Sequence, residues 1–200
     1  EKLWTEVART KAQMKELQKK KAKFRWQKRT YVTTRFSFSQ ALSDSVSETR
    51  AKATTRTGYQ VSLLYQFQLN QSFDLGVGGR IDEETLVQES PNLEIPTSRR
   101  LGMLELTYNF DPAEGENDFF YVGAGVGLGT SETQVEDSIN TGTAFVFPFR
   151  AGYSYPLSQS KAIITELVGE SISATETVGD SNDEQQTTII NSKFSVGLRF

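Results

Sequence analysis

The chain ends on the stretch Lys193–Phe200, KFSVGLRF, in which apolar residues alternate with polar or small ones. Successive side chains of a β-strand point to opposite faces. A strand here would therefore have one face of large apolar side chains and one face that carries a lysine and an arginine. Domains that fold in water rarely end on such a strand. The stretch predicts a terminal strand whose lipid-compatible face consists of Phe194, Val196, Leu198 and Phe200.

The same alternation recurs upstream. It predicts eight strands in all, over residues 31–42, 59–69, 73–82, 100–110, 119–129, 143–155, 161–173 and 188–200. These segments have roughly 10–13 residues, and a tilted strand needs about 9–11 to cross the apolar core of a bilayer. The fold class that follows is all-β: an eight-stranded antiparallel up-and-down β-barrel that spans a membrane.

The segments between the predicted strands differ in length. Long polar connections are expected at residues 43–57, 83–99, 130–142 and 174–187, and short ones at 70–72, 111–118 and 156–160. Bacterial membrane barrels carry longer loops on the extracellular side and short turns on the periplasmic side. The pattern therefore places both ends of the chain in the periplasm.

Composition is compatible with such a barrel. Hydrophobic residues make up 36% of the chain and the mean hydropathy is -0.46, but only every second strand residue of a membrane barrel meets lipid. No run of about 18 apolar residues predicts a transmembrane helix. Charged residues, rather than an apolar stretch, follow Glu1, so we expect any signal peptide to have been removed. The chain has no cysteine and so no disulfide.

Alternation alone also fits a soluble, lipocalin-like barrel, in which the apolar face points inward. The face opposite the apolar one carries nearly all the strand charges, so we expect this face inside and lipid outside. An eight-stranded barrel is just wide enough to be filled by side chains, and buried charges must be paired. We predict a closed interior with a charge network, and a narrow ion path is the alternative; the network residues are Arg35, Asp74, Arg80, Glu105, Arg150, Glu166, Lys193 and Arg199.

Residues 29–200, with this strand count and the KFSVGLRF ending, resemble the small eight-stranded outer-membrane proteins of the OmpA, OmpX and OmpW type. The resemblance implies the outer membrane of a Gram-negative bacterium and an anchoring, adhesion or small-pore role. It also implies contact with the barrel-insertion machinery during biogenesis, and the residues that would be read as the signal are Phe194, Val196, Gly197, Leu198 and Phe200. The chain departs from the OmpA plan because its extension precedes the barrel.

The first 28 residues form a different kind of segment. They contain no Gly or Pro and predict an α-helix, and residues 1–30 hold 11 of the 22 Lys and Arg but only 3 of the 25 Asp and Glu. A weak heptad pattern favours either a basic helix that lies on anionic lipid or a coiled coil that binds a partner protein. The contact candidates are Leu3, Val7, Met14, Leu17, Lys19, Lys20, Lys21, Lys23, Phe24, Arg25 and Trp26. The periplasmic compartment argues against nucleic acid.

The residue inventory disfavours catalysis. The chain has no histidine, so the usual base for an activated serine is missing and no imidazole can bind a metal. The acidic pair Glu83–Glu84 and the acidic segment Asp180–Glu184 (DSNDE) are expected in outer loops, where their oxygens could bind calcium but are better explained as solvated loop residues. We therefore expect no enzyme, no cofactor and no metal, and predict a structural or interaction protein whose periplasmic helix docks a partner or the membrane surface.

Overall fold

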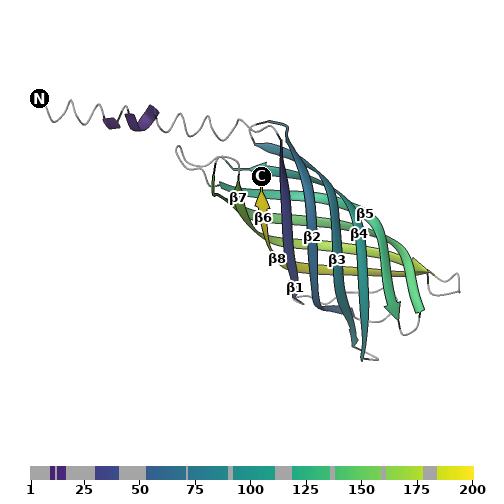
Figure 1. The fold of residues 1–200 in the computed structure, drawn as a ribbon. Coiled ribbons are helices and arrows are strands. Elements are labelled where there is room, and N and C mark those ends of the chain that lie inside the picture. Colours follow the sequence, from purple (N-terminus) through teal and green to yellow (C-terminus); the bar gives the residue numbers. More distant parts are fainter. Residues whose placement is uncertain are drawn as a thin grey trace, which may run out of the picture.

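The structure is a computed structural model that describes residues 10–11, 13–16, 30–40, 53–70, 72–89, 92–110, 119–135, 138–158, 161–177 and 184–200. Its eight strands are β1 (Thr30–Gln40), β2 (Ala53–Gln68), β3 (Phe73–Glu89), β4 (Asn92–Asn109), β5 (Phe119–Val135), β6 (Ser138–Pro156), β7 (Ala162–Thr177) and β8 (Glu184–Arg199). Each strand pairs antiparallel with the next, and β8 pairs with β1, so the sheet closes into a barrel (Figure 1). The predicted all-β, up-and-down architecture is confirmed.

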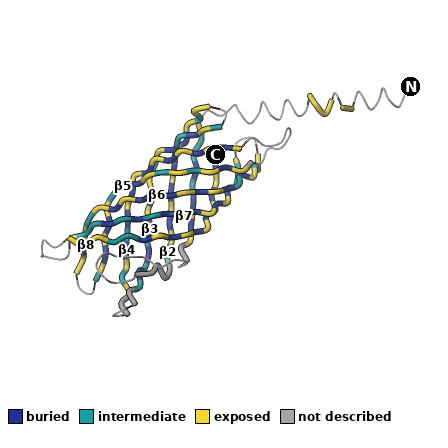
Figure 2. The backbone as a smooth tube through the Cα atoms, turned by 180° about the vertical axis from the view of Figure 1, so that it is seen from behind, coloured by how far each residue is buried: buried dark blue, intermediate teal, exposed yellow. Residues whose placement is uncertain are grey.

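The strand faces have the predicted phase. Buried and exposed residues alternate along the strands (Figure 2). Large apolar side chains such as Phe149 and Leu167, which are 65% and 67% exposed, point outward, whereas Arg35 and Glu166 are buried inside. The lipocalin-like arrangement, with the apolar face inward, is therefore wrong for this chain.

Apolar residues also fill part of the interior. One buried apolar cluster combines residues from six strands: Leu64, Leu86, Leu101, Met103, Ala144, Val146, Ile172, Ala174 and Ile189. β2, β3, β4, β6, β7 and β8 supply these side chains from positions that share a face with the inward charges. The barrel therefore has an apolar layer in its lumen in addition to charged ones.

Two of the predicted long loops are wrong. β3 continues to Glu89 and β4 starts at Asn92, while β5 and β6 meet at the pair Val135–Ser138, so residues 83–89, 92–99, 130–135 and 138–142 are strand. The outward side chains of these extensions are mostly polar, which removes the apolar–polar alternation that identifies a membrane strand. Pro96, a residue type that is rare inside sheets, lies within β4 opposite Thr85.

The extensions make the barrel taller than a bilayer core. β2 to β8 contain 16 to 19 residues. At about 3.3 Å per residue and a tilt of roughly 40–45°, such strands rise about 40 Å, whereas the apolar band of a membrane barrel is about 25 Å tall. The polar extensions therefore project beyond the apolar band at the end opposite the chain terminus.

The terminal motif lies at the seam of the barrel. β1 and β8 pair from Thr33–Arg199 to Ser39–Lys193, and the backbone amides of Val32 and Phe200 donate to each other's carbonyl oxygens at 3.0 Å. Phe200 thus completes the ladder between the first and last strands.

The predicted N-terminal helix is described only in part. Thr10, Lys11 and the stretch 13–16 are helical. Of the helix contact candidates, only Met14 falls on these residues, and its side chain is exposed. The other candidates, from Leu3 to Trp26, lie outside the described residues.

Seam closure can be tested with a disulfide, because the chain has no cysteine of its own. Val32 and Phe200 form a hydrogen-bonded pair, so Ser37 and Ser195, five positions along, form a non-hydrogen-bonded pair. Such pairs have Cα atoms about 4.5 Å apart, which suits a disulfide. The variant Ser37→Cys/Ser195→Cys should oxidise readily and keep its first and last strands linked after proteolysis.

The matched control is Ser37→Cys/Ser131→Cys, which places the second thiol inside the barrel on β5. It should stay reduced under the same mild oxidation. Equal crosslinking of the two variants, or no crosslinking of the seam variant, would contradict the β1–β8 pairing.

Candidate functional site

Four charged side chains form a closed ring across the lumen. Arg35 of β1 contacts Glu105 of β4 at 3.0 Å and Glu166 of β7 at 2.9 Å, and Arg150 of β6 contacts the same two carboxylates at 3.1 and 3.3 Å. Acids and bases alternate, and each is at most 4% exposed. We call these four residues the ionic ring. It joins strands that lie far apart around the barrel.

Glycines make room for the ring. A Cβ atom added to Gly125 of β5 would lie 2.8 Å from Cγ of Glu105, and one added to Gly152 of β6 would lie 2.5 Å from Cζ of Tyr121. The Tyr121 hydroxyl donates to Oε1 of Glu166 at 2.8 Å. The glycine-rich sequence of β5 therefore serves close packing inside the barrel.

An aromatic layer lies between the ring and the end of the barrel that holds Phe200. The guanidinium carbon of Arg199 is 4.4 Å from the ring centroid of Tyr31 and 5.5 Å from that of Tyr121. The Tyr31 hydroxyl donates to the Asp74 carboxylate, which also accepts from Nδ2 of Asn109 at 2.6 Å. This layer packs cationic and aromatic groups across the lumen near the strand ends.

A second set of ion pairs lies on the other side of the ring. Arg80 pairs with Asp82 at 2.5 Å and with Glu170 at 2.6 Å, and Lys193 joins Glu170 to Glu84 at 2.5 and 2.6 Å. Arg99 extends the series, with Nη1 2.9 Å from Glu84. We call these six residues the ionic chain. It contains three acids and three bases, all buried, and the Arg80–Glu170 pair connects β3 with β7 on the opposite wall.

The structure places all eight predicted network residues inside the barrel but divides them among three groups. The ionic ring unites Arg35, Glu105, Arg150 and Glu166. Arg80 and Lys193 belong to the ionic chain, while Asp74 and Arg199 belong to the aromatic layer. The predicted single network therefore consists of three groups at different heights in the lumen, and Tyr121 contacts both Arg199 of the aromatic layer and Glu166 of the ionic ring.

Four members of the ionic chain are absent from the predicted set. Asp82 ends the predicted strand 73–82, and Glu84 and Arg99 fall in the predicted loop 83–99, which is strand in the structure. Glu170 has the same phase on β7 as Glu166, so its inward orientation was readable from the sequence. The prediction that Glu83 and Glu84 lie in a solvated loop is wrong, because both are in β3, where the buried Glu84 pairs with Lys193 and Glu83 accepts a hydrogen bond from Ser98 at 2.9 Å.

The outer face of the barrel forms an apolar band. One edge of the band, at the end of the barrel that holds Phe200, carries exposed aromatic residues: Phe67, Phe73, Tyr108, Phe110, Phe120, Tyr155 and Phe200. At the opposite edge of the band the outward residues change from apolar to polar between one outward residue and the next. The change occurs from Ile81 to Glu83 on β3 and from Leu128 to Thr130 on β5. Aromatic girdles and a sharp polar boundary are typical of barrels in lipid.

The described segments contain no membrane-spanning helix and no cluster of potential metal ligands. No helix there is long and apolar enough to cross a membrane. No group of three or more acidic side chains is placed there to hold a metal ion.

Comparison with solved structures places the fold. The chain is similar to Neisserial surface protein A, with 14% identity, a TM-score of 0.57 and coverage of 86% of this chain and 96% of that one. It also matches the N-terminal β-barrel domain of Pseudomonas aeruginosa OprF, with 16% identity, a TM-score of 0.47 and coverage of 86% and 98%. The outer-membrane protein OprG of the same organism matches with 14% identity, a TM-score of 0.47 and coverage of 86% and 95%.

The comparisons establish the architecture alone. No protein-family model matches the chain, and no curated protein matches it in sequence. The similarity to Neisserial surface protein A confirms the fold of the small eight-stranded outer-membrane barrels.

The ionic ring should contribute strongly to stability. Arg150→Met leaves Glu105 and Glu166 with one arginine between them, and breaking a buried ion pair in this way costs about 3–5 kcal/mol. The double variant Arg150→Met/Glu166→Gln should lose less than the sum of its single variants, because both act on one network. Urea unfolding of the barrel in lipid vesicles measures each free energy of unfolding.

The control is Arg100→Met, which removes an exposed arginine from the outer face of β4. It should change the free energy of unfolding by no more than about 0.5 kcal/mol. A ring variant that behaves like this control, or strictly additive ring variants, would contradict the cross-lumen coupling.

Proposed function

We propose that this chain is an outer-membrane protein of a Gram-negative bacterium, in which a closed barrel anchors an N-terminal basic helix that docks a partner protein or the membrane surface. The observation that supports this function best is the pairing of charges across the lumen at two levels, the ionic ring and the ionic chain. A lumen bridged by salt bridges between opposite walls suits an anchor better than a pore. The role of the chain then lies in the parts that extend from the barrel.

The apolar band supports membrane insertion. Side chains such as Val126 and Leu104 are 38% and 46% exposed on the outer face, and a continuous band of this kind in water would be an aggregation hazard. In a bilayer it would be covered by lipid. The polar strand extensions would then stand on the extracellular side, with both chain ends in the periplasm, since the parts of a membrane barrel that reach beyond the lipid are longer on the extracellular side.

The charge distribution supports the docking role. The eleven basic residues among residues 1–30 would stand at the periplasmic surface, close to phospholipid head groups. Each Lys or Arg near an anionic surface contributes about 1 kcal/mol. A helix with Trp26 and Phe24 among its lysines could bind such a surface, or it could use its weak heptad seam for a periplasmic partner.

The terminal strand fits recognition during biogenesis. Phe194, Val196, Leu198 and Phe200 lie on the outer face of β8, and Gly197 lies on its inner face. We assign these residues to contact with the barrel-insertion machinery before the seam closes.

A narrow channel is the second candidate function. The observation in its favour is a polar strip on one wall of the lumen, where the buried hydroxyls of Ser37, Ser62 and Ser195 make no hydrogen bond to the described part of the chain. These serines lie on the neighbouring strands β1, β2 and β8. Hydroxyl groups of this kind could conduct water or ions if the ionic ring opened.

Insertion can be tested with a charge on the outer face. Val126→Arg puts a cation in the middle of the apolar band on β5, where a membrane barrel loses about 2–4 kcal/mol, whereas Thr130→Arg on the same face lies at the boundary and should cost about 0–1 kcal/mol. Folding equilibria in lipid vesicles measure the change in folding free energy for both variants. Equal costs at the two positions would contradict insertion of the band.

Helix docking can be followed by tryptophan fluorescence, because both tryptophans of the chain, Trp4 and Trp26, precede the barrel. If the helix binds lipid, emission should shift to the blue in anionic vesicles but not in zwitterionic ones. The variant with Lys19, Lys20 and Lys21 changed to Gln should weaken this response by about 3 kcal/mol of surface attraction. The variant with Lys2, Lys11 and Lys15 changed to Gln removes the same charge farther along the chain from the barrel and should weaken the response less, because the proposed contact is centred on the lysines next to Phe24 and Trp26.

If the helix binds a protein instead, the complex purified from native membrane should lose that protein when residues 1–28 are deleted. Docking in either form would be contradicted if the tryptophan emission is the same in anionic and zwitterionic vesicles and the composition of the complex is unchanged after residues 1–28 are deleted.

A further inference from the structure

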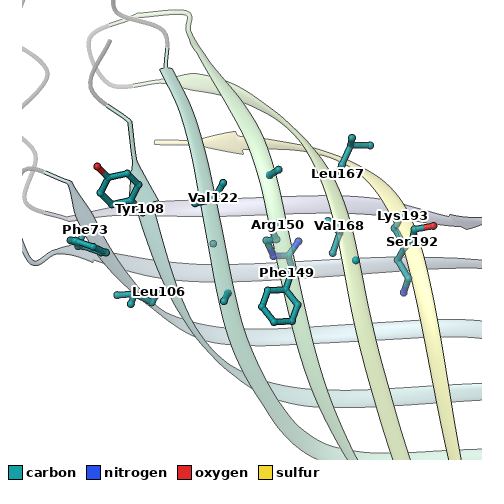
Figure 3. A pocket seen from close by; sticks show the side chains of 14 residues that line it. Phe73, Leu106, Tyr108, Val122, Phe149, Arg150, Leu167, Val168, Ser192 and Lys193 are labelled. Atoms are coloured by element: carbon teal, nitrogen blue, oxygen red, sulfur yellow. The ribbon is translucent and has the colours of Figure 1, made fainter.

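A groove of about 790 Å³ crosses the outer face of the barrel. Its outward lining follows two neighbouring rows of paired residues over β3 to β8 (Figure 3). One row consists of Leu106, Ala124, Phe149, Gly169 and Ser192, and the other of Phe73, Tyr108, Val122, Ala151 and Leu167. Its volume lies within the range of about 300–1,000 Å³ that small-molecule pockets have.

Small residues form the floor of the groove. Ala124, Ala151 and Gly169 carry little or no side chain, and a Cβ atom added to Gly169 would meet no other atom within 4 Å. Phe149 and Leu167 rise beside the floor, each about two-thirds exposed. The chain itself therefore leaves this channel open, between ridges that can contact a bound molecule on two sides.

The groove runs obliquely across the outer face of the barrel. It begins at Phe73, the first residue of β3, whose ring lies 5.0 Å from that of Tyr108 in the aromatic girdle. It ends at Ser192 in the middle of β8. The groove therefore runs from the end of the barrel that holds Phe200 to the middle of the apolar band. Its outward lining is apolar apart from the hydroxyls of Tyr108 and Ser192.

We propose that this groove binds one acyl chain of a phospholipid from the periplasmic leaflet. The proposal rests on the outer-membrane placement given above. Three observations select the occupant: the groove is continuous with the apolar band, it opens at the girdle where head groups lie, and its lining offers no charged group on the outer face. All acyl chains of the bilayer are equally apolar, so the hydrophobic effect does not favour a chain in the groove over a chain in the surrounding lipid. The preference for the groove comes from van der Waals packing of the chain against the ridges.

Photo-crosslinking in vesicles tests this site on the full chain. The probe is a phosphatidylglycerol with a photoreactive group near the end of one acyl chain, and the labelled peptides are mapped by mass spectrometry. Labelling should concentrate on β5, β6 and β7 around Ala124 and Gly169. Gly169→Phe, which fills the floor, should reduce that labelling about tenfold.

Thr165→Phe is the control, because residue 165 faces outward on the same strand but outside the groove. It should leave the labelling pattern unchanged. Even labelling of outward residues on all eight strands, or a second copy of the barrel crosslinked at the groove, would overturn the proposal. Failure of the chain to insert into vesicles at all would instead overturn the proposed function, so the two failures are distinguishable.

Discussion

The pairing of charges across the lumen is the constraint on which the rest of the barrel depends. Arg35 on β1 is buried, and a buried guanidinium is tolerated only if carboxylates reach it. Glu105 and Glu166 do so from strands three and two positions away around the closed sheet. Those contacts require a barrel of this width and a register that keeps all of these side chains inside. They also explain why inward glycines face the ring, since a larger residue at position 125 would collide with Glu105.

The outer face follows from the same register. A strand whose even-numbered residues point inward must present its odd-numbered residues to the surroundings, so the charges gathered in the lumen leave the outside free for apolar side chains. This separation of faces holds over the height of the apolar band and ends where the outward residues become polar, as at Glu83 and Thr130. The strands nevertheless continue, because backbone pairing does not require lipid. The result is a barrel whose upper part extends beyond the apolar band.

Sequence reasoning recovered the parts of this fold that have a two-faced pattern. It identified eight strands, their phase, the seam at Phe200 and the inward location of all eight predicted charges. It missed the upper halves of β3 to β6, because the outward residues of those segments are mostly polar and Pro96 is a residue type that usually ends a strand. The same error concealed Glu84 and Arg99. The pairing of Arg80 with Glu170 rather than with a ring carboxylate depends on height within the barrel, which periodicity does not encode.

The central claim is that charges paired across the lumen close the barrel, so that it serves as an anchor for the basic N-terminal segment. Electrical recording tests this claim most directly. The purified full chain, reconstituted into a planar bilayer, is predicted to give no discrete conductance steps, because the ionic ring and the ionic chain join opposite walls of the lumen. Single-channel steps that disappear when Arg150 or Glu105 is changed would contradict this account and favour the channel.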